Sequence, residues 1–436
     1  MSLVASREVR HPNTKALSGV TRNDKDINKA TFEQYNSRQA LPFLPNQTRE
    51  IEIDASNALL DNHSMHLEFK VEAETSKTYY EEGSGHSYLQ RVTVVNQNGA
   101  VLADLDQYNL WYHMQAFPSV GRRFCNKNWH QGLDNLAPEE LSLPVVALNK
   151  GRASTVAGVT YMIPLNLDLF KHHRYLHLPV LGRIKVKFTF APIAEVAQSA
   201  VGATIPTTYS ITNAVLHARM LEISPSFIDF LEKQSAAGDL IYNPHNVVWQ
   251  TISVGVNDSN TLTLDGNLQS CEKAFVVRRS GLDITGAIPA SAATAKHQLT
   301  KYAAPGDGFD HMQWRHGIQR YPTTTITNHE QSYMFLEEAM GLTGNADCES
   351  LISRENYTDV SVQAATVTLE KTQKFINGME FSRAGRNTGI SLAQNSLQFT
   401  ESISGTRIAA NSDLKMAVVY SSALQVLPNN QVLVGV

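Results

Sequence analysis

The sequence has no long hydrophobic run and few cysteines. No apolar stretch in its 436 residues approaches the roughly 18 residues needed to span a bilayer. The polar start, MSLVASREVRHPNTKALSG, lacks the apolar core of a secretory signal. The three cysteines, Cys125, Cys271 and Cys348, are far apart and lack the spacing of a disulfide framework or a zinc site. We therefore expect a protein that is soluble as made, with buried thiols.

The chain also lacks an excess of charge of one sign. It has 37 Lys and Arg against 41 Asp and Glu, for a net charge of −4. This balance excludes the chain-wide basic field that holds nucleic acid non-specifically, and we expect no sequence-specific nucleic-acid partner. With 42% hydrophobic residues the chain can bury a large core, and its length exceeds one typical domain. Two domains are expected.

Catalytic motifs are missing as well. His329-Glu330 begins like a zinc-protease motif, but the fourth position after His329 is Tyr333, so the second ligand is absent. No G-x-S-x-G serine elbow occurs, and no Walker-type lysine follows a glycine-rich turn. We expect no enzyme activity, no catalytic residue and no cofactor.

Clustered histidines and paired arginines are the remaining candidates for chemistry. His172, His173 and His177 precede a strong strand pattern, and His173 and His177 could share one face. We favour a structural role over a metal site, because no carboxylate has helpful spacing for a third ligand. The pairs Arg122-Arg123 and Arg278-Arg279 predict loop or interface salt bridges.

From Glu50 onward the dominant hydrophobic period is two, which is typical of strands with one buried face. In Arg183–Phe190 the apolar residues Ile184, Val186, Phe188 and Phe190 alternate with polar ones. Similar stretches lie at 51–54, 67–72, 214–223, 247–255, 362–370 and 416–427. Turn residues separate these stretches, so the pattern predicts an antiparallel, all-β protein.

Only three segments carry helix signals. Asp104 is predicted to cap a helix with Gln107 at its third position. Ser224 and Pro225 predict the start of a second helix that ends near Gly238. A third is expected from a cap at Asn328 to Gly341.

These patterns predict four regions. Residues 1–45 are expected to form a polar arm, 46–223 a first sandwich, 224–240 a linker helix, and 241–436 a second sandwich. Each sandwich has enough strand candidates for an eight-stranded jelly roll, so the fold class is all-β, two consecutive jelly rolls with a few short helices in loops and linker.

The predicted arm has a basic balance, with six basic and three acidic side chains in the first 30 residues. It is either a frayed terminus or an assembly arm that contacts a neighbouring subunit or an anionic surface. The basic residues that we expect to make inner-surface or neighbour contacts are Arg7, Arg10, Lys15 and Arg22.

Several stretches resemble the double jelly-roll major capsid proteins of the tectivirus, adenovirus, virophage and polinton lineage. They are 88–117 (YLQRVTVVNQNGAVLADLDQYNLWYHMQAF), 161–192 (YMIPLNLDLFKHHRYLHLPVLGRIKVKFTFAP), 209–223 (YSITNAVLHARMLEI), 376–399 and the ending LKMAVVYSSALQVLPNNQVLVGV. In the ending, Pro428–Asn430 is predicted to be the turn between two strands. Together these stretches and their surroundings cover most of the chain.

The resemblance implies a major capsid protein of an icosahedral DNA virus. Its subunit would form a homotrimer, whose six rolls give a pseudo-hexagonal capsomer that tiles the virion shell. The implied partners are neighbouring capsomers, penton and minor capsid proteins, and an internal viral membrane in some lineage members. The arm would then lie on the inner side of the shell, where its positive charge suits anionic headgroups.

Two other functions are compatible with the sequence. One is a β-sandwich spike protein that binds a receptor or carbohydrate, in which exposed Trp129 or Trp314 would line a sugar site. The other is a β-sandwich hydrolase with dispersed catalytic carboxylates.

Overall fold

The computed structural model describes residues 27–73, 80–81, 83–136, 158–198, 208–254, 259–279, 302, 304, 306–343, 349–358, 374–381, 389–407 and 412–435. The predicted strand at 362–370 and Cys348 lie outside these residues. Cys125 and Cys271 are buried, as expected.

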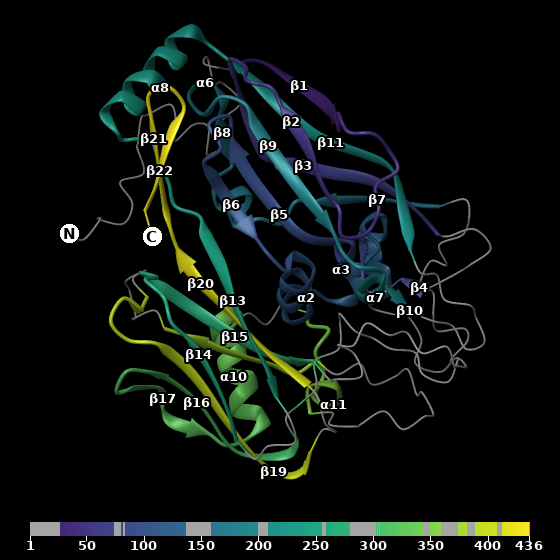
Figure 1. The fold of residues 1–436 in the computed structure, drawn as a ribbon, viewed down its shortest axis with the longest axis vertical. Coiled ribbons are helices and arrows are strands. Elements are labelled where there is room, and N and C mark those ends of the chain that lie inside the picture. The colour runs from purple at the N-terminus through teal and green to yellow at the C-terminus, as the bar shows by residue number, and fades with distance from the viewer. Residues whose placement is uncertain are drawn as a thin grey trace.

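The first half of the chain forms a sandwich of two four-stranded antiparallel sheets, with a short ninth strand at one edge (Figure 1). One sheet has the order β1-β11-β3-β7 and the other the order β2-β9-β5-β6. The strands are β1 (Ile27–Asn36), β2 (Thr48–Ile53), β3 (Ala58–Ala73), β5 (Leu89–Asn96), β6 (Val101–Leu105), β7 (Val159–Pro164), β9 (Ile184–Phe190) and β11 (Tyr209–Ile223). The short strand β8 (Tyr175–His177) pairs with β3, and β4 (Tyr80–Glu81) pairs with β10 (Ala197–Gln198).

The second half repeats this arrangement. Its sheets have the orders β13-β20-β15-β18 and β14-β19-β16-β17. The strands are β13 (His245–Val254), β14 (Ser259–Leu264), β15 (Cys271–Arg279), β16 (Gly306–His316), β17 (Gln319–Ile326), β18 (Ile376–Glu380), β19 (Leu397–Arg407) and β20 (Ser412–Ser421). If the eight main strands of each half are counted in chain order, both halves pair them as 1-8-3-6 and 2-7-4-5. This is the jelly-roll order, so the predicted pair of eight-stranded rolls is confirmed.

Alternation of apolar and polar residues creates the core of each roll. In β9, Ile184, Val186, Phe188 and Phe190 are at most 2% exposed, and the residues between them are half-buried. Burying each of these side chains stabilises the fold by about 1.5–3 kcal/mol. Strand β13 departs from the pattern, with most side chains half-buried on both faces. It lies at the contact between the rolls, where Val247 packs against both hydrophobic cores.

Two of the three predicted longer helices begin and end where expected. In α8 (Pro225–Ala237) Pro225 occupies the first turn, and Gly238 follows in a left-handed conformation. In α10 (His329–Met340) the Asn328 side chain accepts a hydrogen bond from the Gln331 amide. The shorter helices are α3 (Arg122–Lys127), α5 (Asp168–His172), α6 (Leu178–Leu181), α7 (Ile193–Val196), α11 (Arg354–Tyr357), η1 (Gly85–Tyr88), η2 (Trp129–Gln131) and η3 (Leu133–Leu136).

The predicted cap at Asp104 is wrong. Asp104 belongs to strand β6, and its carboxylate accepts hydrogen bonds from the neighbouring strand, from Arg91 Nε and Thr93 Oγ1, both at 2.8 Å. Helix α2 (Tyr108–Ser119) starts later, after Gln107, which has a φ of 48° and makes no side-chain cap. The Asp104 carboxylate therefore stabilises the pairing of β5 and β6 and does not cap the helix.

The predicted arm is too long at its C-terminal end. Residues 27–36 form β1, which pairs with β11 from Ile27 opposite Ile223 to Asn36 opposite Val215. Phe43 is also buried and forms a bridge to Ile211. Because β1 is the first strand of the roll, residues 27–45 belong to the first roll. The candidate contact residues Arg7, Arg10, Lys15 and Arg22 lie outside the described residues.

The chain returns to the first roll after β20. Strands β21 (Ala423–Leu427) and β22 (Gln431–Gly435) form a hairpin that joins β12 (Ile241–Tyr242) in a separate sheet. Figure 1 shows this hairpin, in yellow, beside α8 and α6. Leu424 and Val426 are buried in the core of the first roll, so the prediction that all of 241–436 belongs to the second roll is wrong for this hairpin. Its turn does lie at 428–430, as predicted, with Asn429 and Asn430 at positive φ.

Candidate functional site

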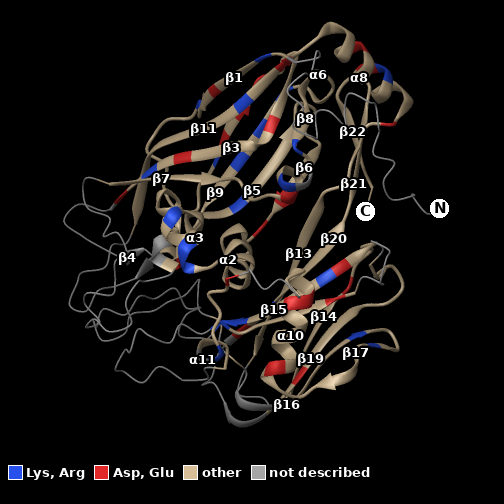
Figure 2. Cartoon of the chain, turned by 180° about the vertical axis from the view of Figure 1, so that it is seen from behind, with Lys and Arg blue, Asp and Glu red and all other residues tan. Residues whose placement is uncertain are grey.

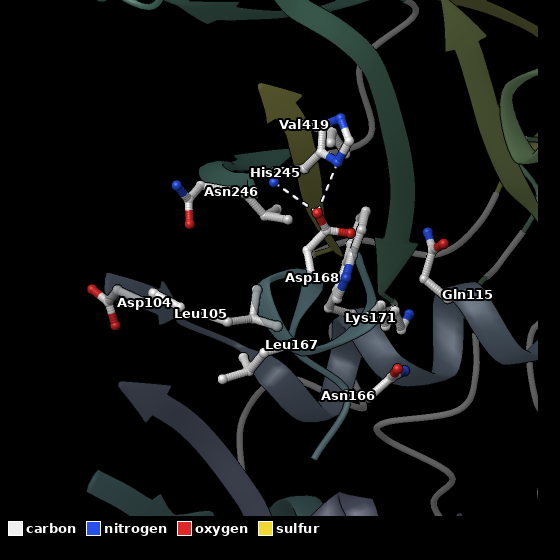
Figure 3. A pocket seen from close by; sticks show the side chains of 13 residues that line it. Asp104, Leu105, Gln115, Asn166, Leu167, Asp168, Lys171, His245, Asn246 and Val419 are labelled. Carbon is white, nitrogen blue, oxygen red and sulfur yellow. Dashed lines mark hydrogen bonds and ion pairs between the residues drawn. The ribbon is translucent and has the colours of Figure 1, made fainter. Parts of the chain in front are cut away.

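A cluster of charged side chains lies where the two rolls meet. Asp168, at the start of α5 in the first roll, faces His245, the first residue of β13 in the second (Figure 3). The Asp168 carboxylate accepts hydrogen bonds from the His245 amide and from Nδ1, both at 2.7 Å. The other ring nitrogen, Nε2, lies 3.2 Å from Glu272 of β15. We call Asp168, His245 and Glu272 the junction triad.

The charge state of the junction triad follows from its geometry. Each ring nitrogen of His245 faces a carboxylate, so both donate, and the ring is an imidazolium. The hydrogen bonds to Asp168 and then to Glu272 raise the pKa of His245 to about 10. Burial opposes ionisation of Glu272, but hydrogen bonds from His245 and Ser421 lower its pKa overall. The triad is therefore a permanent ion cluster at neutral pH and not a proton-transfer site.

A small pocket adjoins the triad, lined by residues of both rolls that include Asp104, Trp111, Lys171 and Val419. Its cavity volume is about 70 Å³. Pockets that bind small ligands usually have about 300–1,000 Å³, so this one has room for a few water molecules only. The pocket belongs to the roll contact.

A second polar cluster at the same contact involves the predicted pair Arg278-Arg279. Arg279 lies 3.9 Å from Glu195 of α7, and Glu195 accepts a hydrogen bond from the Asn109 side chain at 2.8 Å. Lys415 of β20 donates to Gln107 at 2.6 Å. Arg279 thus forms the interface salt bridge that the sequence predicts.

Arg278 points instead into the second roll. It pairs with Glu401 of β19, and the two residues are only 4% and 2% exposed. Asn260 of β14 donates to the same carboxylate oxygen at 3.0 Å. Burial lowers the pKa of Arg278 to about 10, so it remains charged at neutral pH. These contacts link the consecutive strands β14 and β15 to β19, which lies more than 100 residues later in the sequence.

The histidine group holds the segment that follows α8. The His177 amide donates to the Tyr242 hydroxyl at 3.1 Å, and the ring of His177 contacts the same hydroxyl. The Asn243 amide donates to Nε2 of His173 at 2.9 Å. Burial, with a smaller effect of His173, lowers the pKa of His177 to about 4. Within the described ranges, no group of three or more His, Cys, Asp or Glu side chains could hold a metal ion.

A buried serine–histidine contact was not predicted. Ser84 Oγ lies 3.3 Å from His113 Nε2, and both residues are at most 1% exposed. The Nδ1 of His113 faces the Asn109 carbonyl at 2.6 Å, where a catalytic triad would have a carboxylate. Nearby, His86 stacks on Tyr112 with ring centroids 3.5 Å apart, and burial holds its pKa well below the usual value. These side chains form a packed core, and no spacing in the sequence indicates it.

The two tryptophans proposed for a sugar site lie in different environments. Trp129 is 57% exposed on η2, but Trp314 is fully buried in β16. Trp314 Nε1 donates to Asn377 Oδ1 at 2.9 Å inside the second core. The prediction that Trp314 is an exposed ligand residue is therefore wrong, because its place on the inner face of β16 satisfies both its ring and its N–H group.

No helix in the described part of the chain is long and apolar enough to cross a membrane.

Comparisons with known proteins identify the architecture. No protein-family model and no curated sequence matches the chain. Among solved structures, the Faustovirus major capsid protein is similar with a TM-score of 0.61 at 8% identity, covering 94% of this chain and 92% of that one. The PBCV-1 virus capsid matches with a TM-score of 0.59 at 12% identity, covering 95% and 98%. The mavirus major capsid protein matches with a TM-score of 0.52 at 11% identity, covering 93% and 90%. With the strand orders above, these similarities show that the chain has the double jelly-roll fold of these viral major capsid proteins.

Proposed function

We propose that this protein is the major capsid protein of an icosahedral DNA virus and that it is located in the virion. The observation that carries the proposal is the pair of rolls with identical strand order in one subunit. Three such subunits around a three-fold axis place six similar sandwiches in a ring. The resulting homotrimer has a pseudo-hexagonal outline, which allows it to tile a closed shell.

The contact between the rolls supports this function. A capsomer needs its two rolls in a fixed relative orientation, since each subunit contributes two of the six positions. The junction triad, the Arg279–Glu195 contact and the β21–β22 hairpin all join the second half of the chain to the first. These contacts are numerous and include buried apolar ones, which favours one rigid subunit.

A structural, non-enzymatic role agrees with the polar clusters. The junction triad, the Arg278–Glu401 pair and the Ser84–His113 contact are engaged with protein groups of the fold. The pocket beside the triad is smaller than a usual ligand site. These three groups of side chains thus stabilise the fold and the contact between the rolls.

The segment before β1 is the proposed assembly arm. The basic residues Arg7, Arg10, Lys15 and Arg22 lie before Ile27, where pairing with β11 starts. We propose that they contact neighbouring capsomers, penton or minor capsid proteins, or the anionic surface of an internal membrane.

The test is the mass of the purified protein by multi-angle light scattering, followed by negative-stain imaging of the same fraction. A mass near three times 48.2 kDa and hexagonal particles would support the proposal. A monomer at every concentration, or an elongated rod, would contradict it and favour a spike protein.

A further inference from the structure

Each roll has an exposed charged surface in the connection between the same two strands, and the two surfaces have opposite charge. This connection joins the fifth and sixth strands, β6 to β7 in the first roll and β17 to β18 in the second. The first contains α3 and the second contains α10. Figure 2 shows basic residues on α3 and acidic residues on α10.

The surface on α3 combines positive charge with exposed aromatic rings. Arg122, Arg123 and Lys127 are exposed, and Phe124 and Trp129 are 48% and 57% exposed. The neighbouring Cys125 is fully buried in a small apolar cluster with Tyr112, Ala116 and Leu133. The helix is therefore anchored from below while its charged and aromatic side chains face outward. We call these five exposed residues the basic surface.

The surface on α10 carries acidic side chains, of which Glu330 also lies 3.3 Å from Nη2 of the exposed Arg354. Glu330, Met334 and Glu338 are exposed and spaced four residues apart, so they form one stripe along the helix. Met334 is 51% exposed between the two carboxylates. On the opposite side of the helix, Leu336 and Ala339 are fully buried in the second core. We call the exposed stripe the acidic surface.

The two connections already meet once inside the subunit. Arg123 Nε of the basic surface lies 3.9 Å from Glu349, which follows α10 in the chain. The Leu351 amide donates to the Phe117 carbonyl, at the end of α2, at 2.9 Å. The contact within one subunit thus brings a basic connection from the first roll against an acidic one from the second.

We propose that the basic surface of one copy binds the acidic surface of the next copy, and that this contact closes the trimer. The inference rests on the proposed capsomer. In a ring of six rolls, first and second rolls alternate, so every contact between copies again joins a first roll to a second. Such a contact uses two different surfaces of the chain and closes after three copies. Phe124, Trp129 and Met334 supply the apolar centre, and the charges around them supply orientation.

Charge reversal tests the contact. The variant Arg122→Glu/Lys127→Glu changes the basic surface without touching Arg123, and Glu330→Lys/Glu338→Lys changes the acidic one. Each is expected to raise the dissociation constant of the trimer at least about tenfold, because like charges then face each other. The four-site combination restores opposite charges and should recover most of the lost association. As a matched control, Asp229→Lys/Glu232→Lys alters two exposed acids on α8 and should leave the trimer unchanged.

A covalent test does not depend on the size of the electrostatic effect. In the double variant Lys127→Cys/Glu338→Cys, oxidation should link neighbouring copies into covalent trimers on a non-reducing gel, and neither single variant should do so. One outcome contradicts this interface but not the proposed capsomer. It is a wild type that forms trimers, charge-reversal variants whose trimers dissociate as the wild type does, and a double cysteine variant that gives no covalent trimer. If the wild type itself never forms trimers, the proposed function fails first.

Discussion

Asp168 binds His245 through two hydrogen bonds of 2.7 Å, one to the backbone amide and one to the imidazole ring. The contact connects α5, which follows β7 in the first roll, with His245, the first residue of β13 in the second roll. Because the same ring also faces Glu272, a single histidine joins α5, β13 and β15. Asp168 and His245 lie 77 residues apart in the sequence, and their contact helps to fix the relative position of the two rolls.

Replacing Asp168 should loosen the contact between the rolls. Asp168→Asn keeps the size of the side chain but removes the charge opposite the imidazolium. We expect the free energy of unfolding to fall by about 1–3 kcal/mol, the usual effect of losing a hydrogen bond to a charged group. Urea denaturation measures this, with Asp54→Asn, which is largely exposed, as the control. Equal stability of the two variants would contradict a role for the triad.

The junction triad also predicts how stability depends on pH. The pKa of His245 rises from its ordinary 6.5 to about 10 in the fold. The stabilisation that the charged His245 adds to the free energy of unfolding is therefore complete below pH 6.5, and it is lost as the pH rises through 10. Between pH 7 and pH 10 we expect the wild type to lose about 2–3 kcal/mol more than His245→Gln does. Parallel curves of unfolding free energy against pH for the two proteins would disprove this.

The buried Arg278–Glu401 pair predicts strong non-additivity. Arg278→Met leaves a buried carboxylate without its cation and should cost about 3–5 kcal/mol of unfolding free energy. Adding Glu401→Leu removes that unpaired charge and should recover part of the loss. The comparison is a double-mutant cycle measured by chemical denaturation. A double variant less stable than Arg278→Met would show that the pair does not act as a unit.

Truncation separates the proposed arm from the first roll. Deleting 1–26 should leave the trimer and its melting temperature unchanged but impair shell formation, since pairing of β1 begins at Ile27. Deleting 1–45 also removes β1 and buried Phe43, and should destabilise or unfold the first roll. Light scattering, thermal melts and electron microscopy of both proteins test this. If the protein without residues 1–26 forms normal shells, the arm has no role in assembly.

The sequence predicts those elements in which local pattern and tertiary packing agree. Strand β9 alternates because one face is buried, and α8 and α10 carry their end signals in adjacent residues. The sequence pattern does not indicate strand β1, because β1 is an edge strand with most side chains exposed and its residues INKATFEQYN show no apolar face. The pattern assigns Asp104 to a helix cap because an acidic capping residue and an acidic residue of a cross-strand ion pair cannot be distinguished from the sequence alone.

The sequence does not predict which side chains meet in the polar clusters, and the reason is a different one. Arg278 and Glu401 are separated by 123 residues, and Ser84 and His113 by 29, with no motif at either spacing. Their proximity depends on strand order, which no local pattern contains. Only the overall resemblance to double jelly-roll proteins predicts that order, and it does so without naming which side chains meet.

The return of the β21–β22 hairpin to the first roll has a consequence for biosynthesis. Leu424 and Val426 fill the first core, although β11 ends about 200 residues earlier, at Ile223. At about 5–20 residues per second, a ribosome needs roughly 10–40 s to make the intervening chain. During that time Leu424 and Val426 are not yet present to take their places in the first core. The first roll can therefore be completed only after the second has been synthesised. As a result, a subunit can begin to assemble with other copies only when both rolls have been made.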